Sequence, residues 1–300
     1  KALQLNGKTE IEKYGVEPFA RKCMDSVFRY TADWEKLTNR IGFWIDLKDA
    51  YVTYHQSYVE SVWWSLKELH ARGLLYRGHK ILPWCPHCQT ALSSHEVGLG
   101  YQQVEDPSVY ITFRDPDWDK NKLSFLAWTT TPWTLPSNAG LAVKADTEYS
   151  HVSVAGETLV MASALVGHVM GKMKYEVVKK EMGSALVGRR YQPLFDWWHG
   201  LPAHEHGQDA RATAWRVCAA DFVTLDTGAG IVHIAPAFGA DDYNLGQKEG
   251  LPVIQLVDTR GNFTPECGAF AGRFVKDADK DIIKDLHARG LLLKKEGYKH

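Results

Sequence analysis

The sequence predicts an α+β protein in which a mainly helical N-terminal part is followed by a strand-rich part. From Pro18 to about Gly100, apolar residues recur at the three- and four-residue steps of a helix. Beyond Gly100, short apolar runs alternate with turn residues, which is typical of strands. The 300 residues are 45% hydrophobic and 24% charged. This composition supports one large or two ordinary domains and excludes a disordered tail or a peptide-sized scaffold.

The clearest helix of the N-terminal part spans Tyr58 to Arg72. Its apolar residues follow helical spacing: Val59, Val62, Trp63, Leu66 and Leu69. Gly73 supplies a left-handed stop at the end of this helix. We therefore expect an amphipathic helix that packs on a core.

The strand-rich part is predicted from short apolar segments bounded by turn residues. The expected strands are Ser108–Phe113, Ser124–Trp128, Glu157–Val160 and Ile231–Ile234. After the last of these, an acidic pair, Asp241-Asp242, predicts the start of a helix. Helical spacing returns from Lys276 to Arg289.

Charge and cysteine content limit the classes of partner and compartment. Thirty-five Lys and Arg against 36 Asp and Glu give a net charge of −1, so any contact with RNA must be local. The five cysteines are too few, and odd in number, for a disulfide framework. No run of 18 apolar residues and no signal-peptide pattern occurs, so we expect a cytoplasmic protein without a membrane partner. Because the chain starts with Lys1 rather than Met, we expect a piece of something longer.

Cys85 and Cys88 form a proline-flanked Cys-x-x-Cys knuckle, which favours structural zinc over a redox pair. Zinc commonly takes two such knuckles, so this chain holds half a site that should bind the metal weakly. Other side chains without knuckle spacing remain possible ligands: Cys23, Cys218, Cys267, His87 and His95. Catalytic zinc is not expected, because no carboxylate–histidine spacing accompanies the pair.

A seven-residue repeat bears on the missing half of the zinc site. The segment Leu69–Leu75 recurs letter for letter as Leu286–Leu292. The first copy leads into the knuckle, whereas two helices that use the same glycine stop would explain the repeat equally well. We expect the parent protein to carry a second Cys-x-x-Cys just beyond His300.

The segment Trp128–Asn138 reads Trp-Thr-Thr-Thr-Pro-Trp-Thr-Leu-Pro-Ser-Asn. Three consecutive hydroxyl groups at the end of a strand, held by two prolines, offer a fixed row of small donors and acceptors. The alternative is that β-branched threonine is common in strands and its hydroxyls are merely solvated. A threonine hydroxyl is a poor nucleophile without a base, so we expect binding roles rather than covalent catalysis.

A second polar segment runs from Gly228 to Asp242. Its Gly-Ala-Gly start precedes a strand rather than a helix, which argues against a phosphate-binding loop. Taken alone, His233 on an apolar strand reads as a core histidine. Asp242 alone reads as a favourable charge at a helix start.

In this order, the two segments resemble the editing domain of the isoleucyl-tRNA synthetase family, a long insertion in a class I catalytic domain. The resemblance covers essentially all 300 residues and includes these flanking segments: Gly7–Gly15, Arg40–Asp46 and the Cys85–Cys88 knuckle. Thr131 and Trp133 stand where the related valyl and leucyl enzymes have an arginine and an acidic residue. Ser137 is a mild departure, because several members have glycine or alanine there.

The resemblance implies a strand-rich, barrel-like editing domain flanked by mainly helical pieces of a Rossmann-type class I catalytic domain. We expect residues 1–97 to be a partial catalytic-domain segment with the zinc knuckle. Residues 98–285 would be the editing domain, and residues 286–300 would return toward the second knuckle. The signatures of adenylate formation fall outside this chain. ATP and magnesium would therefore serve only the full-length parent, which ligates isoleucine to tRNA(Ile), and this chain should not aminoacylate.

The implied activity is hydrolysis of valine from mischarged tRNA(Ile), with isoleucine excluded by size. The implied partners are the acceptor end of tRNA(Ile), valine as the mischarged group and the remainder of the synthetase. No metal takes part in the hydrolysis in this family, and a ribose hydroxyl assists the water.

The resemblance also implies a role for each matching residue. Asp242 would receive the substrate ammonium; Asp241 is not excluded, although the family spacing of nine residues from His233 selects Asp242. His233 would act as a size gate and positioner. The other residues line or shape the pocket: Thr129, Thr130 and Thr131 as its lining, with Trp128 and Asn138 bracing it.

A basic run provides a possible local contact for RNA. Between residues 172 and 190, six basic residues stand against Glu176 and Glu181: Lys172, Lys174, Lys179, Lys180, Arg189 and Arg190. The alternative is a solvated charged face. Two other functions also remain open, a free-standing deacylase that acts in trans and a non-catalytic tRNA-binding or zinc-stabilised module.

Overall fold

The N-terminal unit, residues 1–80, consists of helices joined by turns and irregular segments. The helices are α1 Lys8–Tyr14, α2 Val16–Phe28, α3 Thr31–Arg40 and α4 Gln56–Ala71. The helix predicted from Tyr58 to Arg72 is thus confirmed as α4. The expectation that it packs on a core is wrong among the described residues of this unit, none of which is buried. Trp63 of α4 is 71% exposed, because no layer of the same unit faces the apolar stripe.

The second unit, residues 81–300, contains the strand-rich part of the chain. The structure is a computed structural model that describes residues 3–195, 197 and 210–299. The chain divides into these two compact units after Lys80, while the domain boundaries expected after residues 97 and 285 stay a prediction. The Cys-x-x-Cys segment therefore packs with residues of the strand-rich unit; for example, Trp84 Nε1 donates to the carbonyl oxygen of Thr259 at 2.8 Å.

The strands of this unit form a hairpin and one large sheet. The hairpin pairs β1 Trp84–Cys85 with β2 Thr90–Ala91. The sheet is built from β3 Glu105–Arg114, β4 Leu123–Thr129, β5 Gly140–Val143, β6 Glu148–Val154, β7 Glu157–Ala162, β8 Glu176–Met182, β9 Arg216–Ala219, β10 Ile231–Ile234 and β11 Leu292–Lys299. Strands predicted from sequence correspond to β3, β4, β7 and β10.

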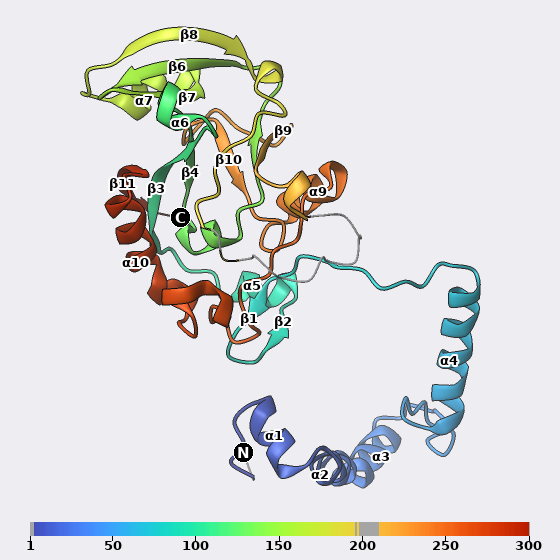
Figure 1. Ribbon diagram of the computed structural model, residues 1–300. Helices are drawn as coiled ribbons and strands as arrows, with labels where there is room; N and C mark the ends of the chain where they lie inside the picture. The colour runs from blue at the N-terminus through green and yellow to red at the C-terminus, as the bar shows by residue number, and fades with distance from the viewer. Residues whose placement is uncertain (1–2, 196, 198–209, 300) are drawn as a thin grey trace. The chain divides into compact units, whose positions relative to one another are not determined.

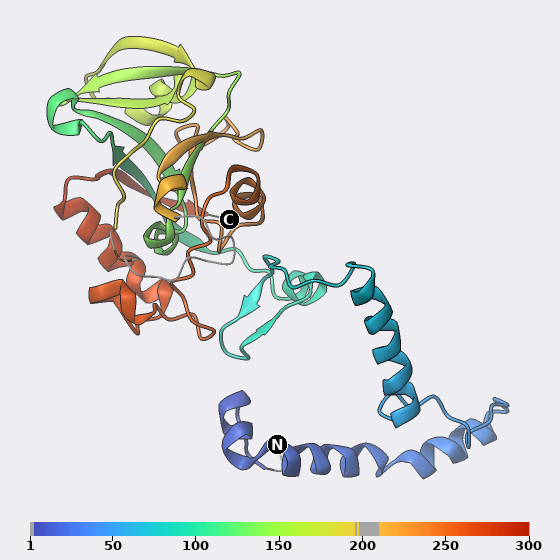
Figure 2. The same ribbon diagram turned by 45° about the vertical axis from the view of Figure 1, so that its right-hand side comes forward.

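The order of the sheet is β8-β6-β7-β4-β10-β5-β9, and β3 extends it by pairing with β4 and β11. The β4–β10, β4–β7 and β5–β9 pairs are parallel, whereas the others are antiparallel. Figures 1 and 2 show that the sheet curls rather than lying flat. The predicted α+β class with a strand-rich, barrel-like part is confirmed.

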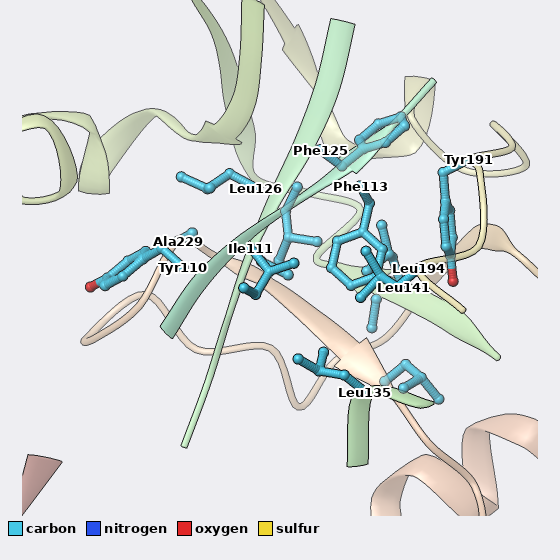
Figure 3. Close-up of a cluster of buried hydrophobic side chains, with 14 of the residues drawn as sticks. Tyr110, Ile111, Phe113, Phe125, Leu126, Leu135, Leu141, Tyr191, Leu194 and Ala229 are labelled. Carbon is cyan, nitrogen blue, oxygen red and sulfur yellow. The ribbon is translucent and has the colours of Figure 1, made fainter. Parts of the chain in front are cut away.

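The core of the second unit lies between the curled strands and the segments that cover them. β3 and β4 read as nearly continuous apolar runs because both of their faces are buried, as expected of strands inside a sheet. Figure 3 shows Ile111 and Phe113 of β3 beside Phe125 and Leu126 of β4. Full burial of a side chain of this size contributes about 1.5–3 kcal/mol.

Short helices complete the unit. They are α5 Ser94–Leu99, α6 Trp118–Asn121, α7 Val166–Met170, α8 Ala210–Thr213, α9 Ala240–Glu249 and α10 Val275–Ala288, with 3-10 turns η1 Pro132–Ser137, η2 Ser163–Leu165, η3 Gly183–Ala185 and η4 Pro265–Phe270. α10 buries the apolar side of its predicted pattern, including Ile282 and Leu286. Over the parts of the chain that are described, no helix has the length and apolar character needed to cross a membrane.

Candidate active site

The candidate site begins at the edge of the sheet where two parallel strands end. Val232 of β10 pairs with Trp128 of β4, so the two strands run side by side in the same direction. Thr129 is the last residue of β4, and His233 lies one residue from the end of β10. Parallel neighbours bring their carboxyl ends to one edge of a sheet, where ligands commonly bind. The threonine segment and the histidine segment therefore meet.

The threonine segment leaves β4 and turns at once into η1. Pro132 occupies the first position of η1, where a missing N–H costs nothing, and Thr131 precedes it. The Thr131 amide donates to Thr129 Oγ1 at 3.1 Å, and Thr134 Oγ1 donates to the Thr131 carbonyl oxygen at 2.8 Å. The hydroxyls of Thr129 and Thr131 are 3.2 Å apart. Within the described chain the half-buried Thr130 hydroxyl has no such partner, so it is available to a ligand.

His233 is buried, with only 6% of its surface exposed. Its Nε2 lies 2.8 Å from Thr134 Oγ1, and its Nδ1 lies 3.5 Å from Asn138 Nδ2. Burial lowers the pKa of His233 to about 4. The imidazole is therefore neutral at neutral pH and is held between two protein partners.

Asn138 connects His233 to the core. Its side-chain amide donates to the Gly140 carbonyl oxygen at 2.8 Å, and its Oδ1 accepts from the Tyr191 hydroxyl at 2.7 Å. All of these groups are buried. The side chain predicted to brace the pocket thus has every polar atom directed toward a named neighbour.

Asp242 lies in the first turn of α9 and bonds the chain just after β10. Its Oδ2 accepts from the Ala235 amide at 2.8 Å, and Gly239 approaches so closely that a Cβ there would lie 2.8 Å from the carboxyl carbon. Burial raises the pKa of Asp242 to about 6, opposed by the Ala235 amide and assisted by Asp241. Asp241 is exposed, so of this acidic pair Asp242 is the one held against the end of β10.

Trp128 lies outside the threonine cluster. Side chains alternate along a strand, so Trp128 is on the opposite face of β4 from Thr129. Its ring packs edge-on against Tyr298 at 5.4 Å, and a Cβ at Gly228 would lie 3.1 Å from it. The structure therefore brings together Thr129, Thr131, Asn138 and His233, with Asp242 nearby along the chain, and places Trp128 elsewhere.

Two residues of this arrangement were not assigned a role from the sequence. The 3-10 turn places Thr134 over Thr131, and from there its hydroxyl contacts His233; its place in the threonine segment was a usable signal. Tyr191 carried no signal, since it contacts Asn138 across 53 residues of chain.

The cysteine knuckle provides two sulfur ligands and no more among the described residues. The Cys88 amide contacts Cys85 Sγ at 3.3 Å, and this backbone hydrogen bond lowers the pKa of the Cys85 thiol. No group of three or more His, Cys, Asp or Glu that could hold a metal occurs in the described parts of the chain. The two thiols suit half of a tetrahedral site, so structural zinc at Cys85 and Cys88 stays a prediction.

The predicted basic run lies on and around the edge strand β8. Three of its six basic residues form ion pairs. Lys179 and Arg189 both contact Glu181, and Lys180 contacts Glu148. Arg190 donates to the Ala212 carbonyl oxygen. In the described structure, Lys172 and Lys174 are exposed and have no ion pair, so they are the freest charges of the run.

Comparison with known proteins gives a consistent family. Residues 1–258 match the family described as tRNA synthetases class I (I, L, M and V). The chain is 46% identical over all its 300 residues to isoleucine–tRNA ligases of Clostridium kluyveri and of Bacillus thuringiensis strain Al Hakam, and it spans 28% of the length of each. The editing domain of P. knowlesi cytosolic leucyl-tRNA synthetase aligns with 67% of this chain and 98% of its own, at 10% identity and a TM-score of 0.43.

We predict that Asp242→Asn stabilises the protein at neutral pH. The folded-state pKa of Asp242 is raised above its ordinary value of 3.8 to about 6, so the folded protein binds the proton more tightly and loses stability as pH rises from about 4 to 6. An uncharged asparagine avoids this penalty, which is on the order of 1–3 kcal/mol. Urea unfolding should show the gain at pH 7–8 and a smaller one near pH 4.

Asp241→Asn is the matched control for this measurement. Asp241 is next to Asp242 in the sequence, but its side chain is exposed. An equal gain for both variants, or a gain for Asp242→Asn that does not depend on pH, would contradict the prediction.

Proposed function

Since the chain belongs to the class I tRNA synthetase family (I, L, M and V), we propose that it performs editing for an isoleucyl-tRNA synthetase. The reaction is hydrolysis of the aminoacyl ester of valyl-tRNA(Ile). The observation that supports it is the 2.8 Å contact between Thr134 Oγ1 and His233 Nε2, which joins segments 99 residues apart in one small polar cluster. The longer parent ligates isoleucine to tRNA(Ile) with ATP, in the cytoplasm, and the remainder of that chain and the tRNA acceptor end are the partners.

Size selection explains why such an enzyme needs a second site. A pocket built for isoleucine gains only about 1–3 kcal/mol over one missing methylene, a limit for which isoleucyl-tRNA synthetases are themselves the standard example. A hydrolytic site that admits valine and rejects isoleucine by overlap multiplies this discrimination. The buried wall formed by His233 and Asn138 suits such rejection, because each side chain is held by neighbours on several sides.

Asp242 supplies the charge that receives the substrate ammonium. Its position in the first turn of α9 favours the ionised form, while burial raises its pKa to about 6. Most molecules therefore carry the carboxylate at neutral pH, and an ammonium group bound beside it lowers its pKa further. A partly desolvated carboxylate of this kind binds a cation more strongly than an exposed one does.

The threonine segment positions the ester and the attacking water. Thr129 and Thr131 bond each other, and the half-buried hydroxyl of Thr130 completes the row. His233 does not act as the general base in this proposal, because both ring nitrogens face protein groups and burial holds its pKa at about 4. A ribose hydroxyl assists the water, and no protein-bound metal is required.

Deacylation assays test the proposal directly. The chain should release valine from valyl-tRNA(Ile), with isoleucyl-tRNA(Ile) slower by roughly tenfold or more. Asp242→Ala should lose at least roughly 30-fold in rate, since it removes one partner of a desolvated charge pair. Asp241→Ala, which changes the exposed neighbour, should retain activity. Binding of tRNA with hydrolysis of neither ester would indicate a non-catalytic module instead.

His233→Ala should reduce discrimination against isoleucine, because it removes part of the wall that overlaps the larger side chain. We expect the valine-to-isoleucine rate ratio to fall by roughly tenfold. His151→Ala is the matched control, since His151 is also buried but contacts Glu181, away from the threonine segment. Selectivity that is unchanged in His233→Ala would remove the gating role.

The freest charges near β8 should carry the electrostatic contact with tRNA. Lys172→Ala with Lys174→Ala should weaken binding and reduce the salt slope by roughly 1–2, in line with slightly less than one per phosphate contact. Lys179→Ala with Lys180→Ala is the control of equal charge, and it should change the slope less because both lysines are ion-paired. Equal slopes for the two double variants would contradict a local track at Lys172 and Lys174.

A further inference from the structure

We propose that Tyr191 is a positioning residue for the candidate site. By donating to Asn138 it fixes the side-chain amide, and through that amide it keeps His233 in one neutral tautomer with the ring proton on Nε2. The hydrogen-bond geometry carries this inference, whereas its consequence for selectivity rests on the proposed editing function.

The threonine side of the cluster accommodates this tautomer. The Thr131 carbonyl oxygen accepts from the Thr134 amide at 3.0 Å and lies 2.8 Å from Thr134 Oγ1, so the Thr134 hydroxyl can direct its single proton to the same carbonyl. Thr134 Oγ1 is then free to accept from His233 Nε2, 2.8 Å away. A proton on Nε2 therefore fits this side of the cluster, and the asparagine side selects it.

The asparagine side leads to the same tautomer. The Gly140 carbonyl oxygen accepts at 2.8 Å, so the atom of Asn138 that faces it must be the amide nitrogen and not the oxygen. The second proton of this nitrogen is directed toward His233 Nδ1 at 3.5 Å. Two donors cannot face each other, so Nδ1 carries the lone pair.

Tyr191 completes the arrangement from the core. Its hydroxyl lies 2.7 Å from Asn138 Oδ1, and burial raises the pKa of Tyr191 well above its usual value, so the hydroxyl keeps its proton and donates it. The ring packs edge-on against Phe113 at 5.3 Å, and Figure 3 shows both in the hydrophobic cluster with Leu194. Because packing holds the Tyr191 ring in place, its hydroxyl donates to Asn138 Oδ1 from a fixed position, which favours one orientation of the Asn138 amide.

Removal of the Tyr191 hydroxyl leaves a buried acceptor without a donor. Such an orphaned group costs more than the net value of the hydrogen bond, and this cost offsets the hold of the Gly140 carbonyl oxygen on the amide nitrogen, so a second orientation of the Asn138 amide becomes populated. Rotation moves its nitrogen away from His233 Nδ1 and allows the second tautomer, in which Nε2 no longer donates to Thr134. The wall against the substrate side chain then has two arrangements instead of one.

The experiment compares Tyr191→Phe with Tyr149→Phe. The Tyr149 hydroxyl is also buried and bonded, to the Gly230 carbonyl oxygen at 2.7 Å and the Lys144 amide at 2.9 Å, but it does not contact Asn138. Both variants lose one buried hydroxyl, and only one of them disturbs the amide. The probe is long-range ¹H–¹⁵N NMR of ¹⁵N-histidine-labelled protein, with the His233 signals identified by their loss in His233→Gln.

The wild-type protein and Tyr149→Phe should show a single His233 tautomer, protonated on Nε2, from pH 5.5 to 8. Tyr191→Phe should show a second tautomer, and its valine-to-isoleucine deacylation ratio should fall by about three- to tenfold relative to Tyr149→Phe. A wild-type His233 that is protonated on Nδ1, or on both nitrogens, would overturn the inference. So would a Tyr191→Phe variant with wild-type tautomer and selectivity. A wild-type chain without deacylase activity would overturn the proposed function, while the NMR comparison would still decide the role of Tyr191.

Discussion

Parallel pairing of β4 with β10 brings together two segments that are about a hundred residues apart in the sequence. β4 ends at Thr129 and β10 ends just after His233, so both chains leave the sheet at the same edge. The 3-10 turn that follows β4 then carries Thr134 onto the His233 ring. A single register of two strands thus accounts for the contact between the two polar segments.

Burial determines the charge of each group at this edge. His233 is neutral because its ring is buried, and Asp242 remains ionised only at some cost in stability. Asp279 on α10 is a second case: burial raises its pKa to about 6, and it faces the backbone amide of Trp133 at the start of η1. These are the carboxyl groups with raised pKa in the described chain, and each bonds a segment of the candidate site. Such costs are typical of sites where function, rather than stability, selects the side chain.

The sequence predicted much of this arrangement, and its failures have physical causes. Strands such as β3 and β4 were recognisable because burial on both faces produces continuous apolar runs. The helix α4 was recognised, but its packing was not, since spacing shows that an apolar face exists and not what covers it. Resemblance indicated His233 and Asp242, whereas Tyr191 depends on a contact across 53 residues that no local pattern encodes. The basic run was visible, but its neutralisation by Glu148 and Glu181 required the pairing of β6 with β8.

The proposed selectivity follows from how little the polar cluster can move. Asn138 bonds three neighbours, and His233 is held between Asn138 and Thr134. A wall of this kind cannot yield by rotating one side chain, because each rotation leaves a buried donor or acceptor unpaired at about 1–3 kcal/mol. An oversized side chain must therefore pay for overlap, which costs a similar amount in a packed interior. A smaller side chain meets neither penalty. Steric exclusion at a rigid polar wall can thus reject isoleucine and admit valine, whereas a pocket built for isoleucine cannot reject the smaller valine well.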